Sequence, residues 1–227
     1  HRLRNRHIPE LPNHFVLPRY DGYSIANIGP TIAKVFDVNL EDAAPPIPSD
    51  LWSDLAADVD CVILLLLDAV GYLQLRRYIA DETSIFTRLA LEGRLLPITS
   101  VFPSTTVTAL TSIWTGQTPL GHGFLGTKLL LPKQGVLANL LKMAPASHVG
   151  ASNLAEWGWE PERFVTVSSL AQQLEAAGIH TIAHTRRHFI GSTLTQIFLR
   201  GMNDLQGYID LSDLWINLRH TLTHRPA

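Results

Sequence analysis

The stretch DVDCVILLLLDAVG, residues 58–71, decides the fold class that we expect for this chain. Residues 62–67 are six consecutive apolar side chains, without the polar–apolar alternation of a strand that has one exposed face. Acidic residues precede this run, and Asp68 and Gly71 follow it, which indicates a strand buried on both faces. Such strands belong to parallel sheets, so the sequence predicts an α/β fold with a mostly parallel central sheet and helices on both faces.

The residues after this run alternate between helical and strand-like patterns, as an α/β fold requires. Gly93 and Gly116 are expected to end two of the helices, because glycine readily adopts the backbone conformation found just after a helix. The patterns predict helices over residues 72–80, 84–91, 107–114, 169–177, 193–200 and 212–222, and strands over residues 94–101, 129–131 and 179–184.

The composition of the chain narrows the classes of function. With 46% hydrophobic and 17% charged residues, its 227 residues can form a substantial core. The net charge of -2 gives no global field for an acidic polymer, so we expect no nucleic-acid partner. The longest apolar run, residues 61–67, is far shorter than the roughly 20 residues of a membrane span, so we expect none. The single cysteine, Cys61, fits a reducing compartment such as the cytoplasm.

A proline-rich stretch, residues 43–48, divides the chain. Proline lacks the backbone N–H that helices and sheets use, so this stretch indicates a linker. We therefore expect residues 1–48 to be a leader segment with its linker and residues 49–227 to be the main domain.

Two further patterns are interpreted as structural rather than functional. Residues 121–126 spell the G-x-G-x-x-G dinucleotide fingerprint, but a strand-like segment follows where that motif requires a helix. His180, His184 and His188 recur at metal-ligand spacing, yet no nearby carboxylate or cysteine completes a site, so we interpret them as structural or surface histidines.

Asp68 and Thr106 are the candidate functional residues, because each stands at the end of a predicted element. Asp68 follows the predicted buried strand, at the sheet edge where α/β proteins bind ligands, and could coordinate a cation. Thr106 stands at the start of a predicted helix, whose backbone amides favour an anion. Both residue types are also good helix N-caps, and Ser104 and Thr105 compete with Thr106 for that role, so capping stays open as the alternative for each.

The order and spacing of these motifs resemble the type I phosphodiesterase/nucleotide pyrophosphatase family of the alkaline phosphatase superfamily. The similar segments are residues 62–71, 89–93 and 102–116, followed by Pro119, His122 and Gly123. The resemblance implies an alkaline-phosphatase-like fold and a phosphoric-ester hydrolase that uses two divalent cations, usually zinc.

The resemblance also assigns roles to individual residues. Asp68 matches the first metal-binding aspartate of the family, and Thr106 matches the nucleophile, whose oxygen is held by one cation while it attacks phosphorus. The substrate implied is a small-molecule phosphoester. Family members that act on nucleotides commonly carry Asn where this chain has Ala109, so the choice between phosphodiester and phosphomonoester stays open.

The remaining metal ligands of the family lie in downstream motifs that this sequence lacks: an Asp-x-x-x-His, an Asp-His-Gly and a later lone histidine. We therefore expect the chain to be the N-terminal part of the domain, carrying only the nucleophile and first metal ligand, with the missing C-terminal part as its partner. Alternatives are an inactive family remnant that serves as a binding or interaction module, and an unrelated α/β hydrolase or transferase.

Overall fold

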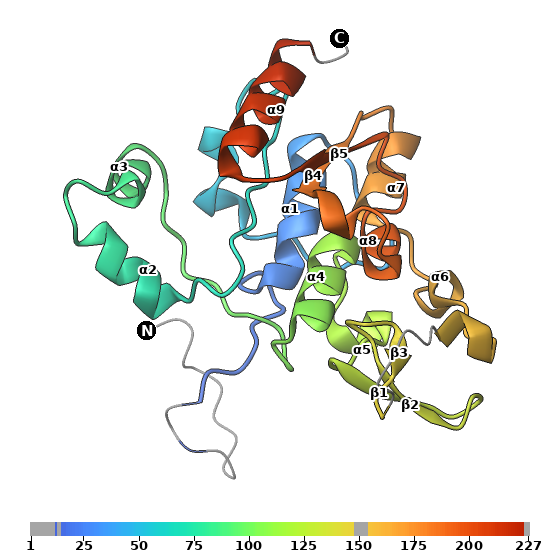
Figure 1. Ribbon diagram of the computed structural model, residues 1–227. Helices are drawn as coiled ribbons and strands as arrows, with labels where there is room; N and C mark the ends of the chain where they lie inside the picture. Colours follow the sequence, from blue (N-terminus) through green and yellow to red (C-terminus); the bar gives the residue numbers. More distant parts are fainter. Residues whose placement is uncertain (1–11, 13–14, 148–153, 225–227) are drawn as a thin grey trace.

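The computed structural model describes residue 12, residues 15–147 and residues 154–224 (Figure 1). The described chain is a mixed α/β structure of helices and small sheets. Its helices are α1 (Ile28–Val35), α2 (Tyr72–Ile79), α3 (Ile85–Glu92), α4 (Thr106–Thr115), α5 (Pro119–His122), α6 (Pro161–Phe164), α7 (Leu170–Ala176), α8 (Thr193–Phe198) and α9 (Leu211–Thr223). Its strands are β1 (Lys128–Leu131), β2 (Val136–Asn139), β3 (Ala144–Pro145), β4 (Ile182–Arg186) and β5 (Asp204–Tyr208).

The strands form two separate sheets within the described residues. Strands β1, β2 and β3 pair antiparallel in sequence order, with Leu129 opposite Ala138. Strands β4 and β5 pair parallel, with His184 opposite Gln206, and α8 lies in the connection between them. The α/β class is confirmed, but these small sheets do not form the expected mostly parallel central sheet.

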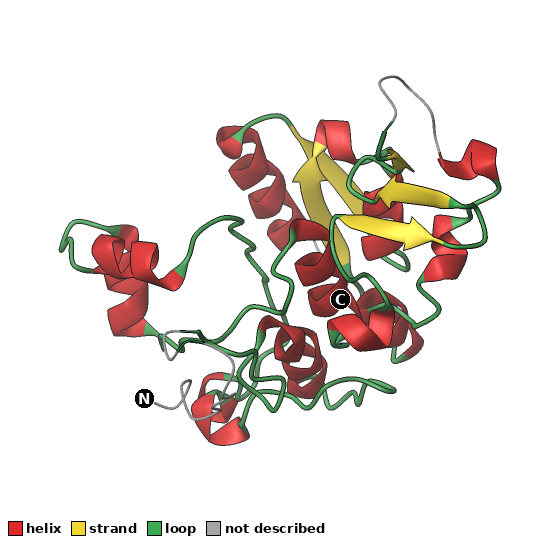
Figure 2. Ribbon diagram, turned by 90° about the horizontal axis from the view of Figure 1, so that it is seen from below, coloured by secondary structure: helices red, strands yellow, loops and turns green. Residues whose placement is uncertain are grey.

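The prediction of a buried strand at residues 62–67 is wrong for this structure. These residues form no strand, and Ile63 and Leu65 are each 54% exposed. The physical reason is that a two-faced strand needs neighbours for its backbone and cover for both faces, and no described strand pairs with this segment. Helices α2 and α3, which follow it, pack on each other and stand away from the main body in both views (Figures 1 and 2).

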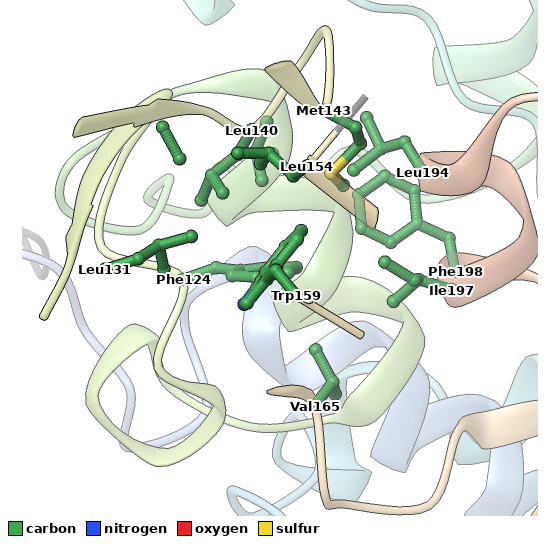
Figure 3. Close-up of a cluster of buried hydrophobic side chains, with 12 residues drawn as sticks. Phe124, Leu131, Leu140, Met143, Leu154, Trp159, Val165, Leu194, Ile197 and Phe198 are labelled. Atoms are coloured by element: carbon green, nitrogen blue, oxygen red, sulfur yellow. The ribbon is translucent and has the colours of Figure 1, made fainter. Parts of the chain in front are cut away.

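The largest apolar core lies between α4, the β1–β2 hairpin and α8 (Figure 3). The rings of Phe124 and Phe164 stack there with centroids 5.0 Å apart. The buried members of this core are Val107, Phe124, Leu131, Ala138, Leu140, Met143, Leu154, Trp159, Val165, Leu194, Ile197 and Phe198.

The segment before the proline-rich stretch packs against α4 through α1. In α1, Ala33 lies in a second apolar cluster with Leu170 and Leu174 of α7. A Cβ on Gly29 would lie 2.6 Å from the carbonyl oxygen of Ile113, so α1 and α4 approach at backbone distance. The backbone N–H of Ala44 donates to the carbonyl of Gly116, just beyond α4. Helix α4 is therefore held from this side as well as by the main core.

Most predicted helices are confirmed, since α2, α3, α4, α7, α8 and α9 lie within a few residues of the expected ranges. Ser84 caps α3, and Gly116, at φ 68°, ends α4. The strand expected over residues 94–101 is reduced to one parallel bridge between Thr99 and Ser24, so that prediction is wrong in extent. None of the described helices is both long and apolar enough to cross a bilayer.

Candidate functional site

Thr106 is the first residue of α4, and its neighbour Thr105 is the N-cap. Thr105 has extended backbone angles, and its Oγ1 accepts a hydrogen bond from the backbone N–H of Thr108. The same Oγ1 lies 3.0 Å from the Thr108 hydroxyl oxygen. Because Thr105 performs the capping, the side chain of Thr106 is not needed for it.

The hydroxyl of Thr106 lies at the surface, whereas the next two residues of α4 are buried. Thr106 is exposed, while Val107 and Thr108 are both inaccessible to solvent. The first backbone N–H groups of a helix lack carbonyl partners within it and carry a partial positive charge. The exposed hydroxyl of Thr106 can therefore meet an anionic ester whose oxygens face the amide of the same residue.

Asp68 lies in an exposed turn between residues 62–67 and α2. Its Oδ1 accepts a hydrogen bond from the backbone N–H of Ala69 at 2.8 Å. Ala69 has φ 61°, a conformation that residues with a Cβ rarely adopt. The N-cap of α2 is Gly71, so Asp68 does not cap this helix.

The structure does not bring Asp68 and Thr106 into contact through any hydrogen bond among the described residues. Asp68 precedes α2, which packs on α3, whereas α4 packs against α1, α5, α7 and α8. The described part of the chain also contains no group of three or more His, Cys, Asp or Glu side chains that could hold a metal ion.

The three histidines at four-residue spacing lie on different parts of the chain and have different neighbours. His184 is in β4, with Nε2 3.3 Å from the Thr221 hydroxyl of α9. His188 is in a short 3-10 helix, where its ring contacts the ring of Phe189. His180 precedes β4 in the chain.

A buried hydrogen-bonded pair between α4 and α5 was not predicted from the sequence. His122, at the end of α5, places its Nε2 2.9 Å from Ser112 Oγ of α4. Burial lowers the pKa of His122 to about 4. The available signal was the Gly121–His122–Gly123 turn after Pro119, which belongs to the pattern at residues 121–126 that we interpret as structural.

The family model for type I phosphodiesterase / nucleotide pyrophosphatase matches residues 62–202. The chain belongs to this family. The matched range contains Asp68, Thr106, Ser112 and His122. No curated protein and no solved structure matches the chain.

Membership places the chain in a class of phosphoric-ester hydrolases that generally depend on divalent cations. Asp68 and Thr106 offer one carboxylate and one hydroxyl, whereas protein zinc sites use about three or four protein ligands. These two residues therefore do not by themselves fit a two-cation centre.

Proposed function

We propose that the chain takes part in phosphoester hydrolysis with Thr106 as the nucleophile. One observation at the start of α4 carries this proposal: Thr105 caps the helix, and the neighbouring Thr106 is exposed. The family match supports the reaction class, since phosphoric-ester hydrolases break a P–O bond and such a hydroxyl would attack the phosphorus atom of that bond.

The proposed reaction has two steps. The Thr106 oxygen attacks phosphorus opposite the leaving oxygen, so that the new O–P bond forms as the old one breaks. The proton of the Thr106 hydroxyl is lost to water, and the leaving oxygen takes a proton from water. Water then cleaves the phosphothreonine and restores the hydroxyl. The N–H group of Thr106, the exposed first residue of α4, faces the negative charge on the phosphoryl oxygens.

Asp68 is proposed as a cation ligand in this reaction. Its carboxylate is exposed, and it does not cap α2, so its second oxygen is available to a cation. We propose zinc as the cation at two sites, because zinc accepts oxygen as well as nitrogen donors. The Thr106 oxygen is proposed as a further donor. Further ligands than these two are needed to complete either site.

The substrate is proposed to be a small-molecule phosphoester. Ala109 lies one turn after the start of α4, and its methyl group cannot donate a hydrogen bond to a phosphate oxygen. A monoester and a diester therefore both need testing. We further propose that residues 49–227 belong to an alkaline-phosphatase-like phosphoesterase domain and that residues 1–48 precede it.

A second function is favoured by a specific observation. The described residues contain no cluster of three metal-binding side chains, and the turn that holds Asp68 precedes α2, which packs mainly on α3 and not on α4. An inactive family member that serves as a binding or interaction module would have this arrangement.

Hydrolysis assays on the full chain test the proposal. Bis-p-nitrophenyl phosphate and p-nitrophenyl phosphate would be offered with and without added zinc, to the wild type and to Thr106→Ala and Thr106→Ser. We expect zinc-dependent release of nitrophenol that Thr106→Ala abolishes and that Thr106→Ser, which keeps a hydroxyl, retains in part. Equal rates in the wild type and Thr106→Ala would reject Thr106 as the nucleophile.

A further inference from the structure

The buried pair of His122 and Ser112 has a defined direction of hydrogen bonding. Ser112 is fully buried, and His122 is only 3% exposed. The backbone N–H of Phe124 donates to His122 Nδ1 at 3.1 Å, so this ring nitrogen carries the lone pair. The ring proton therefore lies on Nε2, and His122 donates to Ser112 Oγ. Because His122 is the donor, it does not act as a base toward the serine hydroxyl.

Helix α4 has a buried face of hydroxyl side chains rather than apolar ones. The hydroxyls of Thr111 and Thr115 each donate a hydrogen bond to the carbonyl four residues earlier in α4, at 2.7 Å. Thr108 pairs with the cap residue Thr105. These bonds satisfy the hydroxyls but join α4 only to itself. The bond from His122 to Ser112 differs, because it joins the buried hydroxyl face of α4 to the side chain of another helix.

The same contact leads back to the start of the helix. Ser112 stands one turn after Thr108, and Thr108 bonds the N-cap next to Thr106. The carbonyl of Thr108 also lies close enough to His122 to oppose the fall in its pKa. The ring of His122 thus contacts α4 at Thr108 and Ser112, which follow the candidate nucleophile Thr106 by two and six residues.

We propose that His122 is a positioning residue, whose neutral ring donates from Nε2 to Ser112 and thereby fixes α4, and with it Thr106, in place. This inference rests on the proposed function of Thr106. His122 acts through the helix, since it touches neither Thr106 nor a substrate.

The electrostatic surroundings agree with a neutral ring. Burial lowers the pKa of His122 to about 4, so the ring is uncharged at neutral pH. The groups that face it are the Ser112 hydroxyl, the Thr108 carbonyl and the Phe124 amide and ring, none of which titrates.

Two amide variants separate the two hydrogen bonds of the ring. His122→Gln places an amide nitrogen near the position of Nε2 and keeps the donor to Ser112. His122→Asn places its oxygen near Nδ1, which keeps the acceptor for Phe124 but does not reach Ser112. We expect phosphorylation of Thr106 in a single turnover to slow by about 100-fold in His122→Asn, as for a misplaced reacting group, with little change in KM. His122→Gln should stay within about 3-fold of the wild type.

Ser112→Ala supplies the matched change on α4. It should slow the reaction as His122→Asn does, and the double variant should be no slower than either single one, because both remove the same bond. Additive losses, or a His122→Asn rate equal to that of His122→Gln, would overturn the inference.

Hydrogen exchange gives a readout that does not depend on catalysis. The amides of α4 should exchange faster in His122→Asn than in His122→Gln, and equal exchange in the two variants would overturn the positioning role. A wild type that never labels Thr106 would instead reject the proposed function, while the exchange of α4 would still decide whether His122 holds the helix.

Discussion

At the residue scale, the decisive feature is which hydroxyl caps α4. Ser104, Thr105 and Thr106 have the same capping chemistry, so the sequence could place a helix start here but could not choose among them. The backbone makes the choice, because Thr105 is extended while Thr106 is already helical. The candidate Thr106 was therefore predictable from the sequence, but its release from the capping role was not.

A pair of alanine variants measures this division of roles. Thr105→Ala removes the acceptor for the Thr108 N–H and should lower the free energy of unfolding by about 1 kcal/mol. Thr106→Ala removes an exposed hydroxyl and should change it by less than about 0.5 kcal/mol. Urea unfolding followed by circular dichroism compares the two. A larger loss in Thr106→Ala would return Thr106 to the cap.

His122 makes the stability depend on pH. Burial lowers its pKa from 6.5 to about 4 in the folded chain, so between these values the unfolded chain binds more protons. Above pH 6.5 the ring is neutral in both the folded and the unfolded chain, so His122 does not change the free energy of unfolding. As the pH falls from 6.5 toward 4, the free energy of unfolding decreases by up to about 3 kcal/mol. Urea unfolding at several pH values in this range should show a smaller slope in His122→Gln, which cannot titrate. If the free energy of unfolding depended on pH as steeply in His122→Gln as in the wild type, the pH dependence would not come from His122.

At the element scale, local signals predicted the helices and the strands β1 and β4, whereas the strands expected over residues 62–67 and 94–101 depend on non-local pairing and do not form. Ser84 and Ser169 cap α3 and α7 from positions that the sequence marks directly. The run at residues 62–67 carries a strong strand pattern, but a strand forms only where another strand pairs with it. Strand β5 was missed for the opposite reason, because its sequence DLQGY is largely polar and includes a glycine that disfavours strands.

Matching leucine variants test where the core lies. Leu140 is fully buried in the core cluster, so Leu140→Ala should cost about 2–5 kcal/mol of unfolding free energy. Leu65 is 54% exposed, and Leu65→Ala should cost less than about 1 kcal/mol. Chemical denaturation of both variants gives the comparison. Equal losses would mean that residues 62–67 are buried in solution, as the sequence pattern predicts.

At the scale of the whole molecule, the segment before the proline-rich stretch shares a core with α4 and α7. The composition marks residues 43–48 as a boundary, but it carries no information on how α1 packs across that boundary. The close approach of Gly29 to Ile113 depends on the tertiary fold, so no local pattern could reveal it.

Two glycine variants test this packing. A Cβ on Gly29 would meet the carbonyl oxygen of Ile113 at 2.6 Å, so Gly29→Ala should destabilise the chain by about 1–3 kcal/mol through overpacking. Gly71 has open space around its Cβ position, and Gly71→Ala should stay within about 0.5 kcal/mol of the wild type. Thermal unfolding distinguishes them. If Gly29→Ala were neutral, α1 would not pack on α4 as described.

The most direct test of the central claim is the mass of the peptide that carries Thr106. The full chain would be mixed with a phosphoester and zinc, quenched in acid within one turnover and digested for mass spectrometry. We expect a phosphoryl group on Thr106 in the wild type and an unmodified peptide in Thr106→Ala. A phosphoryl group on another residue, or turnover of the substrate with Thr106 never modified, would contradict this claim.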